Sequence, residues 1–99
     1  MLISENSNNN IVRSSQLLNN VLNGVDVYPG VTGTRILSNT VNGNGNGIVL
    51  RSGATGSTVK SNTAKNNTVF DMEDDNGPTC DTNVWQNNNF NTANEPCIH

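Results

Sequence analysis

The side chains that could perform chemistry gather in one short acidic segment. Its carboxylates are Asp71, Glu73, Asp74 and Asp75, and carboxylate oxygens are the ligands that Ca²⁺ prefers. The segment is therefore a candidate calcium site, and Ca²⁺ is the only cofactor that the sequence suggests. The alternative is a solvated acidic turn whose charge a nearby arginine balances. The composition favours this alternative, because a catalytic site needs several converging groups and the only histidine, His99, is the last residue.

A face that contacts ligands is the second possibility. In the repeat described below, Tyr28, Arg51 and Glu73 form one outward-facing column, and Asp71 lies in the column beside it. Stacked strands are about 4.8 Å apart, so the Arg51 side chain is expected to contact the Tyr28 ring on one side and to pair with Glu73 on the other. These four residues are the candidate ligand contacts, and the family resemblance given below implies that the ligand is a carbohydrate. A solvated face with balanced charges would explain the same pattern.

A repeat of about 23 residues supplies the elements that must position these side chains. The segment that begins at Tyr28 aligns with the segment that begins at Arg51, and each contains short runs of alternating apolar residues. Such runs predict β-strands, and the connections are too short for crossover helices. The strands must therefore stack as a solenoid, in which neighbouring coils bury each other's apolar faces. The identical pairs at this offset include Gly30 with Gly53, Thr32 with Thr55, Gly33 with Gly56, Ser38 with Ser61, Asn39 with Asn62, and Thr40 with Thr63.

The sequence predicts a single all-β domain over residues 1–99, a right-handed parallel β-helix of about four coils. The coils span approximately residues 1–24, 25–47, 48–69 and 70–99. Like residues are expected to stack in interior columns, because each coil continues the core of the one before it. The predicted columns are Val25, Ile48 and Phe70; Val27, Leu50 and Met72; and, on a second wall, Val12, Ile36, Val59 and Val84.

Asparagine is unusually frequent, at 21 of the 99 residues. It tolerates turn conformations, and identical asparagines stacked in register can bond to one another through their side-chain amides. We expect such a ladder at Asn39, Asn62 and Asn87, which keep a constant distance in sequence from the predicted interior column of the second wall. Solvent-facing loop asparagines are the simpler alternative.

Two cysteines, Cys80 and Cys97, lie in the polar last quarter of the chain. They are consistent with two free thiols or with one disulfide. The disulfide is favoured because few apolar residues would surround a buried thiol in this part of the chain. Closing a loop of this length also contributes about 3 kcal/mol to the free energy of unfolding. A disulfide would place the protein in an oxidising compartment.

Charge and hydrophobicity exclude several classes of protein. The net charge is −3 and the five basic residues are scattered, which argues against a nucleic-acid partner. No apolar run is long enough to cross a bilayer, so membrane insertion is not expected. Hydrophobic residues make up only 32%, too few for an ordinary globular core, whereas the charged fraction of 13% is low for a disordered chain. A turn-rich solenoid satisfies both observations.

Two segments of the sequence resemble a known group of proteins. The run from Asn39 to Leu50 looks like a repeat of the pectate-lyase-like superfamily of right-handed parallel β-helices. The ending, from Asn83 to Phe90 and on to Cys97, is similar to the terminal coil of secreted bacterial β-helix proteins. In those proteins a cysteine before the last coil would pair with one near the terminus. The resemblance covers essentially the whole chain, and it is specific for the fold rather than for the function.

The resemblance implies a secreted or cell-surface bacterial protein. Members usually have more coils and a cap over the N-terminal end of the core, whereas Met1–Ile3 here align with the strand Val25–Val27. We therefore expect an uncapped N-terminal end, as in a fragment of a longer chain or in a protomer that stacks on a partner. The favoured function is a non-catalytic structural or adhesive module that contacts carbohydrate and self-stacks into dimers or filaments. The alternative is the C-terminal part of a polysaccharide lyase or epimerase.

Overall fold

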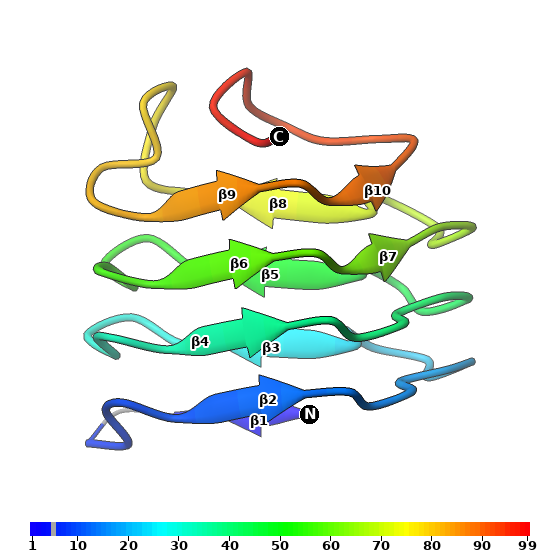
Figure 1. The fold of residues 1–99 in the computed structure, drawn as a ribbon, viewed down its shortest axis with the longest axis horizontal. Helices are drawn as coiled ribbons and strands as arrows, with labels where there is room; N and C mark the ends of the chain where they lie inside the picture. Colours follow the sequence, from blue (N-terminus) through cyan, green and yellow to red (C-terminus); the bar gives the residue numbers. More distant parts are fainter. Residues whose placement is uncertain (5) are drawn as a thin grey trace.

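The computed structural model describes residues 1–4 and 6–99 and consists of short strands joined by turns (Figure 1). No helix occurs within these ranges, in agreement with the all-β prediction. None of these residues belongs to a helix that is long and apolar enough to cross a membrane. The strands are β1 (Leu2–Ile3), β2 (Ile11–Arg13), β3 (Val25–Val27), β4 (Arg35–Leu37), β5 (Ile48–Leu50), β6 (Thr58–Lys60), β7 (Thr63–Ala64), β8 (Met72–Asp74), β9 (Val84–Gln86) and β10 (Asn89–Phe90).

The strands form two main walls and a short third one. The order β1-β3-β5-β8 makes the first wall, β2-β4-β6-β9 makes the second, and β7 pairs with β10 in the third. All of these pairs are parallel. The chain passes from the first wall to the second in every turn, and the strands of the two walls run in opposite directions (Figure 1). The fold is therefore a parallel β-solenoid of about four turns, which confirms the predicted fold class.

The core consists of columns of like residues, one from each coil. Val12, Ile36 and Val59 occupy paired positions on the second wall, and Val25 pairs with Ile48 on the first. All five side chains are buried. Their burial removes apolar surface from water at every contact between coils, so each coil depends on its neighbours for stability.

The last coil of the first wall is displaced from the predicted register. Ile48 pairs with Met72 and Leu50 pairs with Asp74, so Phe70 does not enter the column of Ile48. The observed pairing differs from the predicted one by two residues, and the turn before β8 contains these two residues. A carboxyl group, that of Asp74, consequently occupies the interior position that Leu50 holds one coil earlier, and it is fully buried.

The second wall is displaced by one residue in the same coil. Trp85, and not Val84, pairs with Val59. Trp85 is 4% exposed, whereas Val84 is 49% exposed. The cause is a longer connection from β8 to β9, residues 75–83, than from β5 to β6, residues 51–57. Because side chains alternate across a strand, a displacement of one residue exchanges the inward and outward faces.

Candidate functional site

Arg51 joins two neighbouring coils on the outer face of the first wall. Its Nε and Nη2 atoms donate to the Oδ1 and Oδ2 atoms of Asp26, each at 2.8 Å. Its guanidinium carbon lies 5.2 Å from the centre of the Tyr28 ring. The predicted contact with Tyr28 is confirmed, whereas the ion-pair partner is Asp26 rather than Glu73. Since the pair is bidentate, the orientation of the guanidinium plane is fixed as well as its position.

The ion pair determines the charge states of both partners. Burial raises the pKa of Asp26, but hydrogen bonds from Arg51 and Asn23 outweigh it and leave the pKa below its ordinary value. Asp26 in turn holds the pKa of Arg51 above its ordinary value. The Arg51 side chain is 43% exposed, so solvent screens the pair and its contribution to stability is about 1 kcal/mol at most. The two charges cancel on this part of the surface.

Glu73 and Asp75 form a second pair of charged groups on this face. Glu73 pairs with Val49, which in turn pairs with Asp26, so these side chains share one outward column. Burial raises the pKa of Glu73 to about 7, and a hydrogen bond with Asp75 and the charge of that carboxyl act in the same direction. Near pH 7 the Glu73 carboxyl is therefore close to its titration midpoint.

Replacing Glu73 with glutamine is expected to weaken the pH dependence of stability. A carboxyl whose pKa is raised in the folded protein binds protons more tightly there than in the unfolded chain. Its contribution is therefore fully present below its ordinary pKa of 4.5 and is lost as the pH rises through about 7. Wild-type protein should lose unfolding free energy between about pH 5 and pH 8, and Glu73→Gln should lose less. Urea unfolding at several pH values measures both slopes.

The control for this experiment is Asp81→Asn, which alters an exposed carboxyl in the connection before β9 and should keep the wild-type slope. The lowered pKa values of Asp26 and Asp71 act with the opposite sign, because their stabilisation is lost as the pH falls below their ordinary pKa of 3.8. These two carboxyl groups therefore do not change the free energy of unfolding between about pH 5 and pH 8, the interval in which Glu73 titrates. A Glu73→Gln slope equal to that of the wild type would contradict the raised pKa.

Asp71 does not lie on the outer face. Its side chain is buried in the turn before β8, where Oδ1 accepts from the backbone N and Nδ2 of Asn67 at 3.1 and 2.8 Å. Its Oδ2 accepts from the backbone N–H groups of Asn91 and Thr92 at 3.0 and 3.1 Å. Burial raises the pKa of Asp71, yet these hydrogen bonds hold it below its ordinary value. The structure thus removes Asp71 from the predicted carbohydrate-contacting group, whose other three members face outward.

The acidic segment does not assemble into the predicted calcium site. Asp71 and Asp74 are buried, Glu73 is half-buried and Asp75 is exposed. Alternation along β8 separates them, since successive side chains of a strand point to opposite faces. Across residues 1–4 and 6–99, no three Asp, Glu, His or Cys side chains come together as metal ligands would.

An asparagine ladder follows the turn after the second wall. Oδ1 of Asn62 accepts from the backbone N and Nδ2 of Asn39 at 2.9 and 3.0 Å, and Oδ1 of Asn88 accepts from the same groups of Asn62 at 2.9 and 3.1 Å. The ladder is confirmed at Asn39 and Asn62, but its last member is Asn88 and not Asn87. Asn87 is exposed and has a φ of 56°, like Ser61 (59°) one coil earlier. The correction follows from the one-residue displacement of the second wall.

A second ladder, not predicted from the sequence, follows the next turn. Oδ1 of Asn44 accepts from the backbone N and Nδ2 of Asn20 at 2.9 and 2.8 Å, and Oδ1 of Asn67 accepts from the backbone N of Asn44 at 2.8 Å. Asp71 ends this ladder by accepting from Asn67. Asn44 and Asn67 are 23 residues apart, so the repeat itself carried the signal that would have revealed it.

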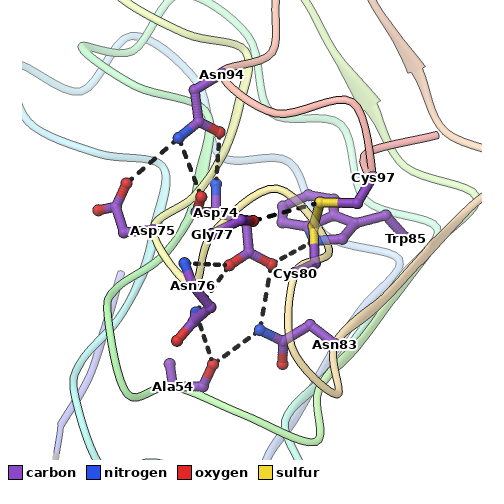
Figure 2. The surroundings of a disulfide bond; sticks show 10 residues. All are labelled: Ala54, Asp74, Asp75, Asn76, Gly77, Cys80, Asn83, Trp85, Asn94 and Cys97. Atoms are coloured by element: carbon purple, nitrogen blue, oxygen red, sulfur yellow. Dashed lines mark hydrogen bonds between the residues drawn. A yellow bond between two sulfur atoms is a disulfide. The ribbon is translucent and has the colours of Figure 1, made fainter.

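The C-terminal end of the solenoid is covered by the segment that follows β10 (Figure 1). The predicted disulfide joins Cys80 and Cys97, whose Cα atoms are 5.9 Å apart. Trp85 and Ile98 are each 4% exposed and belong to the core at this end. Figure 2 shows the Asp74 carboxyl beside the disulfide, where it accepts a hydrogen bond from the Trp85 indole at 2.8 Å. This end is therefore closed by covalent, apolar and polar contacts together.

The opposite end exposes the outer edges of β1 and β2. Each is the last strand of its wall among the residues that the structure describes. Leu2 pairs with Asp26, as the alignment of the first residues predicts. Leu2 and Ile11, which lie on these strands, are 58% and 52% exposed. A pocket of about 160 Å³, lined in part by Met1, Leu2 and Leu22, adjoins β1. The Leu2 and Ile11 side chains belong to outward-facing columns, whereas the inward side chains of this coil, Ile3 and Val12, are buried.

The geometry defines the class of protein as a parallel β-solenoid with asparagine ladders between its coils. Against known proteins, the sequence matches no family model, no curated protein and no solved structure. The functional argument consequently rests on the residues described above.

Proposed function

We propose that this chain is a non-catalytic structural module that associates with further copies of itself through its β1–β2 end. The difference between the two ends of the solenoid is the observation that carries the proposal. The outer edges of β1 and β2 lie at one end, whereas a disulfide-linked segment covers the other. An exposed strand edge presents unpaired N–H and C=O groups, which form a template for pairing with another chain.

The ladders support a structural role. The buried amides of Asn39, Asn44 and Asn62 each use both the oxygen and the nitrogen within the solenoid. Fully satisfied polar networks of this kind rigidify a core and specify one register. A short rod with a fixed register suits a stalk or an adhesive surface.

The charged side chains support a non-catalytic assignment. Asp71 accepts four hydrogen bonds within the solenoid, and Arg51 is held by Asp26. Acid–base catalysis requires a group that exchanges a proton with the substrate, together with a partner that positions the reaction. Glu73 has a suitable pKa of about 7, but the side chain to which it hydrogen-bonds is another carboxyl, that of Asp75.

The disulfide supports a location outside the cytoplasm. Disulfides persist in secreted and cell-surface proteins and are rare in reducing compartments. The Cys80–Cys97 bridge links the covering segment to the loop before β9. We propose a location outside the bacterial cell or on its surface, which the resemblance of the sequence to pectate-lyase-like β-helix proteins also implies.

Light scattering over a concentration series tests the association. A single chain has a mass of 10.6 kDa. We expect the weight-average mass to rise above this value at micromolar to millimolar concentrations, the range in which small interfaces associate. A mass that remains 10.6 kDa throughout the series contradicts the proposal.

Contact with an acidic polysaccharide is a second candidate function, favoured by the position of Tyr28. Its ring is 38% exposed, lies against the Arg51 guanidinium and lines the pocket beside β1. An aromatic ring offers an apolar face to a sugar, and the Arg51 guanidinium, which Asp26 holds in place, supports that ring from one side. Calorimetric titration with polygalacturonate and alginate should show binding that Arg51→Ala weakens and that Arg35→Ala, on the other wall, leaves unchanged.

The same polysaccharides distinguish a binding module from a lyase. Incubation with Ca²⁺ and measurement of the ultraviolet absorbance of an unsaturated product would report lyase activity. Product that disappears in Glu73→Gln would support the enzyme alternative with Glu73 as the base, because a general base must titrate near the working pH. Absence of product from the wild type supports the structural module.

A further inference from the structure

Several asparagines of this chain precede a glycine, and in this dipeptide the asparagine side chain loses ammonia most readily. The reaction begins when the backbone nitrogen of the glycine attacks the side-chain amide carbon of the asparagine, and glycine permits the approach because it has no side chain. The nitrogen must give up its proton, so a glycine N–H that is held in a hydrogen bond resists the reaction. The pairs are Asn23-Gly24, Asn42-Gly43, Asn44-Gly45, Asn46-Gly47 and Asn76-Gly77.

The first four pairs lie where two coils meet, and their glycines are enclosed. A Cβ atom built on any of these four glycines would meet another atom closer than 3.0 Å, so a ring formed at the glycine nitrogen has little room. Each N–H also donates to a carbonyl oxygen of a neighbouring coil. These bonds join Gly24 to Asn46 at 2.9 Å, Gly43 to Lys65 at 3.2 Å, Gly45 to Leu22 at 2.7 Å and Gly47 to Phe70 at 2.9 Å.

The pair Asn76-Gly77 differs in both respects. It lies in the longer connection from β8 to β9. Within the part of the chain that the structure describes, the Gly77 N–H donates no hydrogen bond, and a Cβ atom on Gly77 would meet nothing within 4 Å. Pro78 and Thr79, which follow, are exposed. Water and hydroxide therefore reach the Gly77 nitrogen without separating two coils.

The asparagine side chains do not distinguish the five pairs. Every one of them is hydrogen-bonded within the solenoid, and Oδ1 of Asn76 accepts from the backbone N of Gly53 at 2.8 Å. These bonds slow the reaction at all five asparagines relative to an unfolded chain. The state of the glycine nitrogen consequently decides which asparagine reacts.

We propose that Asn76 is a site of spontaneous deamidation in the folded protein. The Gly77 nitrogen bonds to Cγ of Asn76, the bond from Cγ to Nδ2 breaks, and ammonia leaves with the proton that the glycine nitrogen gave up. Water then opens the cyclic imide and leaves aspartate or isoaspartate at this position. The reaction uses no reactant other than water. The proposal goes beyond the structural role and does not depend on self-association.

The product would weaken the cover of the C-terminal end. Nδ2 of Asn76 donates to the carbonyl oxygens of Arg51 and Ala54, each at 3.1 Å, and to Oδ1 of Asp74 at 2.8 Å (Figure 2). Deamidation replaces this donor with a charged oxygen that faces three acceptors, one of them on a buried carboxyl, which is unfavourable. The affected connection carries Cys80, whose disulfide holds the covering segment.

A tryptic peptide map tests the site, because cleavage after arginine and lysine separates the pairs. Residues 14–35 contain the first pair, residues 36–51 contain the next three, and residues 66–99 contain Asn76. Folded protein is kept in mildly alkaline buffer, reduced, digested and analysed by mass spectrometry. The change from amide to carboxyl should accumulate in peptide 66–99 about tenfold faster than in the other two, since their glycines must first break a bond between coils. Fragmentation of that peptide should place the change at Asn76.

Protein that is unfolded in urea with its disulfide reduced is the control. There, all three peptides should change at similar rates. A preference for peptide 66–99 that persists in urea would assign the selectivity to the sequence rather than to the fold and would overturn the inference. Equal rates in the folded protein, or a change at a different asparagine of peptide 66–99, would overturn it as well.

Two variants test the consequence for the cover. Asn76→Asp imitates the product and should unfold at a lower urea concentration than the wild type, as followed by the fluorescence of Trp85. Asn66→Asp adds the same charge at an exposed turn residue and should keep the wild-type midpoint. Equal midpoints for the two variants would contradict the weakening of the cover. The peptide map uses wild-type protein, so the site remains testable if Asn76→Asp does not fold.

Discussion

Replacing Asp74 with leucine is expected to lower the free energy of unfolding by about 3 kcal/mol or more, although leucine suits the column in which Asp74 lies. Oδ1 of Asp74 accepts from the backbone N and Nδ2 of Asn76 at 3.0 and 2.8 Å. Oδ2 accepts from Asn83 Nδ2 at 3.2 Å and from Trp85 Nε1 at 2.8 Å (Figure 2). The carboxyl therefore organises both the loop before β9 and the side chain that seals the core.

The expected loss comes from the donors that the leucine would leave behind. Asn83 retains a second acceptor, the carbonyl oxygen of Ala54, but the Trp85 indole N–H would lose its partner inside the core. A buried donor without an acceptor costs about 1–3 kcal/mol, and the lost bonds to Asn76 add to this. The gain from a buried leucine side chain is about 2 kcal/mol, which offsets only part of the loss of four bonds.

Urea unfolding measures the effect with two probes. Trp85 is the only tryptophan, so its fluorescence reports the covered end, and circular dichroism reports the whole solenoid. Asp75→Leu is the control, because Asp75 is the adjacent carboxyl but is exposed, and this variant should not lose stability. Equal stabilities of Asp74→Leu and wild type would show that the apolar column, and not the hydrogen-bond network, determines the stability of the last coil.

The first three coils could be predicted from the sequence because they have nearly the same length. A constant offset between identical residues such as Ser38 and Ser61 fixes which residues stack, and stacking fixes which side of each strand is buried. The strand pair of Ile36 with Val59 follows from this offset, and the pair of Leu2 with Asp26 lies one residue beyond it. The same offset predicts the contact between Arg51 and Tyr28.

The last coil could not be predicted in this way, because its turns differ in length from those of the others. The longer connection before β9 moves Trp85 into the core in place of Val84. Placing Asp74 in the interior contradicts the apolar pattern, and only the donors on distant residues make its burial tolerable. Hydrogen-bond partners such as Trp85 are set by the fold and cannot be read from the spacing of apolar residues.

Replacing Asn62 with alanine is expected to lower the free energy of unfolding by about 3 kcal/mol, a large part of the 5–15 kcal/mol typical of a domain. Asn62 is 1% exposed and lies in the middle of the first ladder. Its oxygen accepts from two groups of Asn39, and its Nδ2 donates to the carbonyl oxygen of Ile36 at 2.8 Å and to Oδ1 of Asn88 at 3.1 Å. Alanine would remove these bonds to the coil on either side, and the buried backbone N–H of Asn39 would lose its acceptor.

The two adjacent asparagines of the last coil provide the control that separates a ladder from ordinary loop asparagines. Asn88→Ala should lose stability, because Oδ1 of Asn88 accepts hydrogen bonds from Asn62 and its Nδ2 donates to the carbonyl oxygen of Val59 at 2.9 Å. Asn87→Gly should change stability by less than about 0.5 kcal/mol, because Asn87 is exposed and glycine accepts its φ of 56° without strain. Urea unfolding of the three variants ranks them. Loss of stability at Asn87 with none at Asn88 would restore the register predicted from the sequence, and no loss at Asn62 would mean that apolar stacking alone sets the register of the coils.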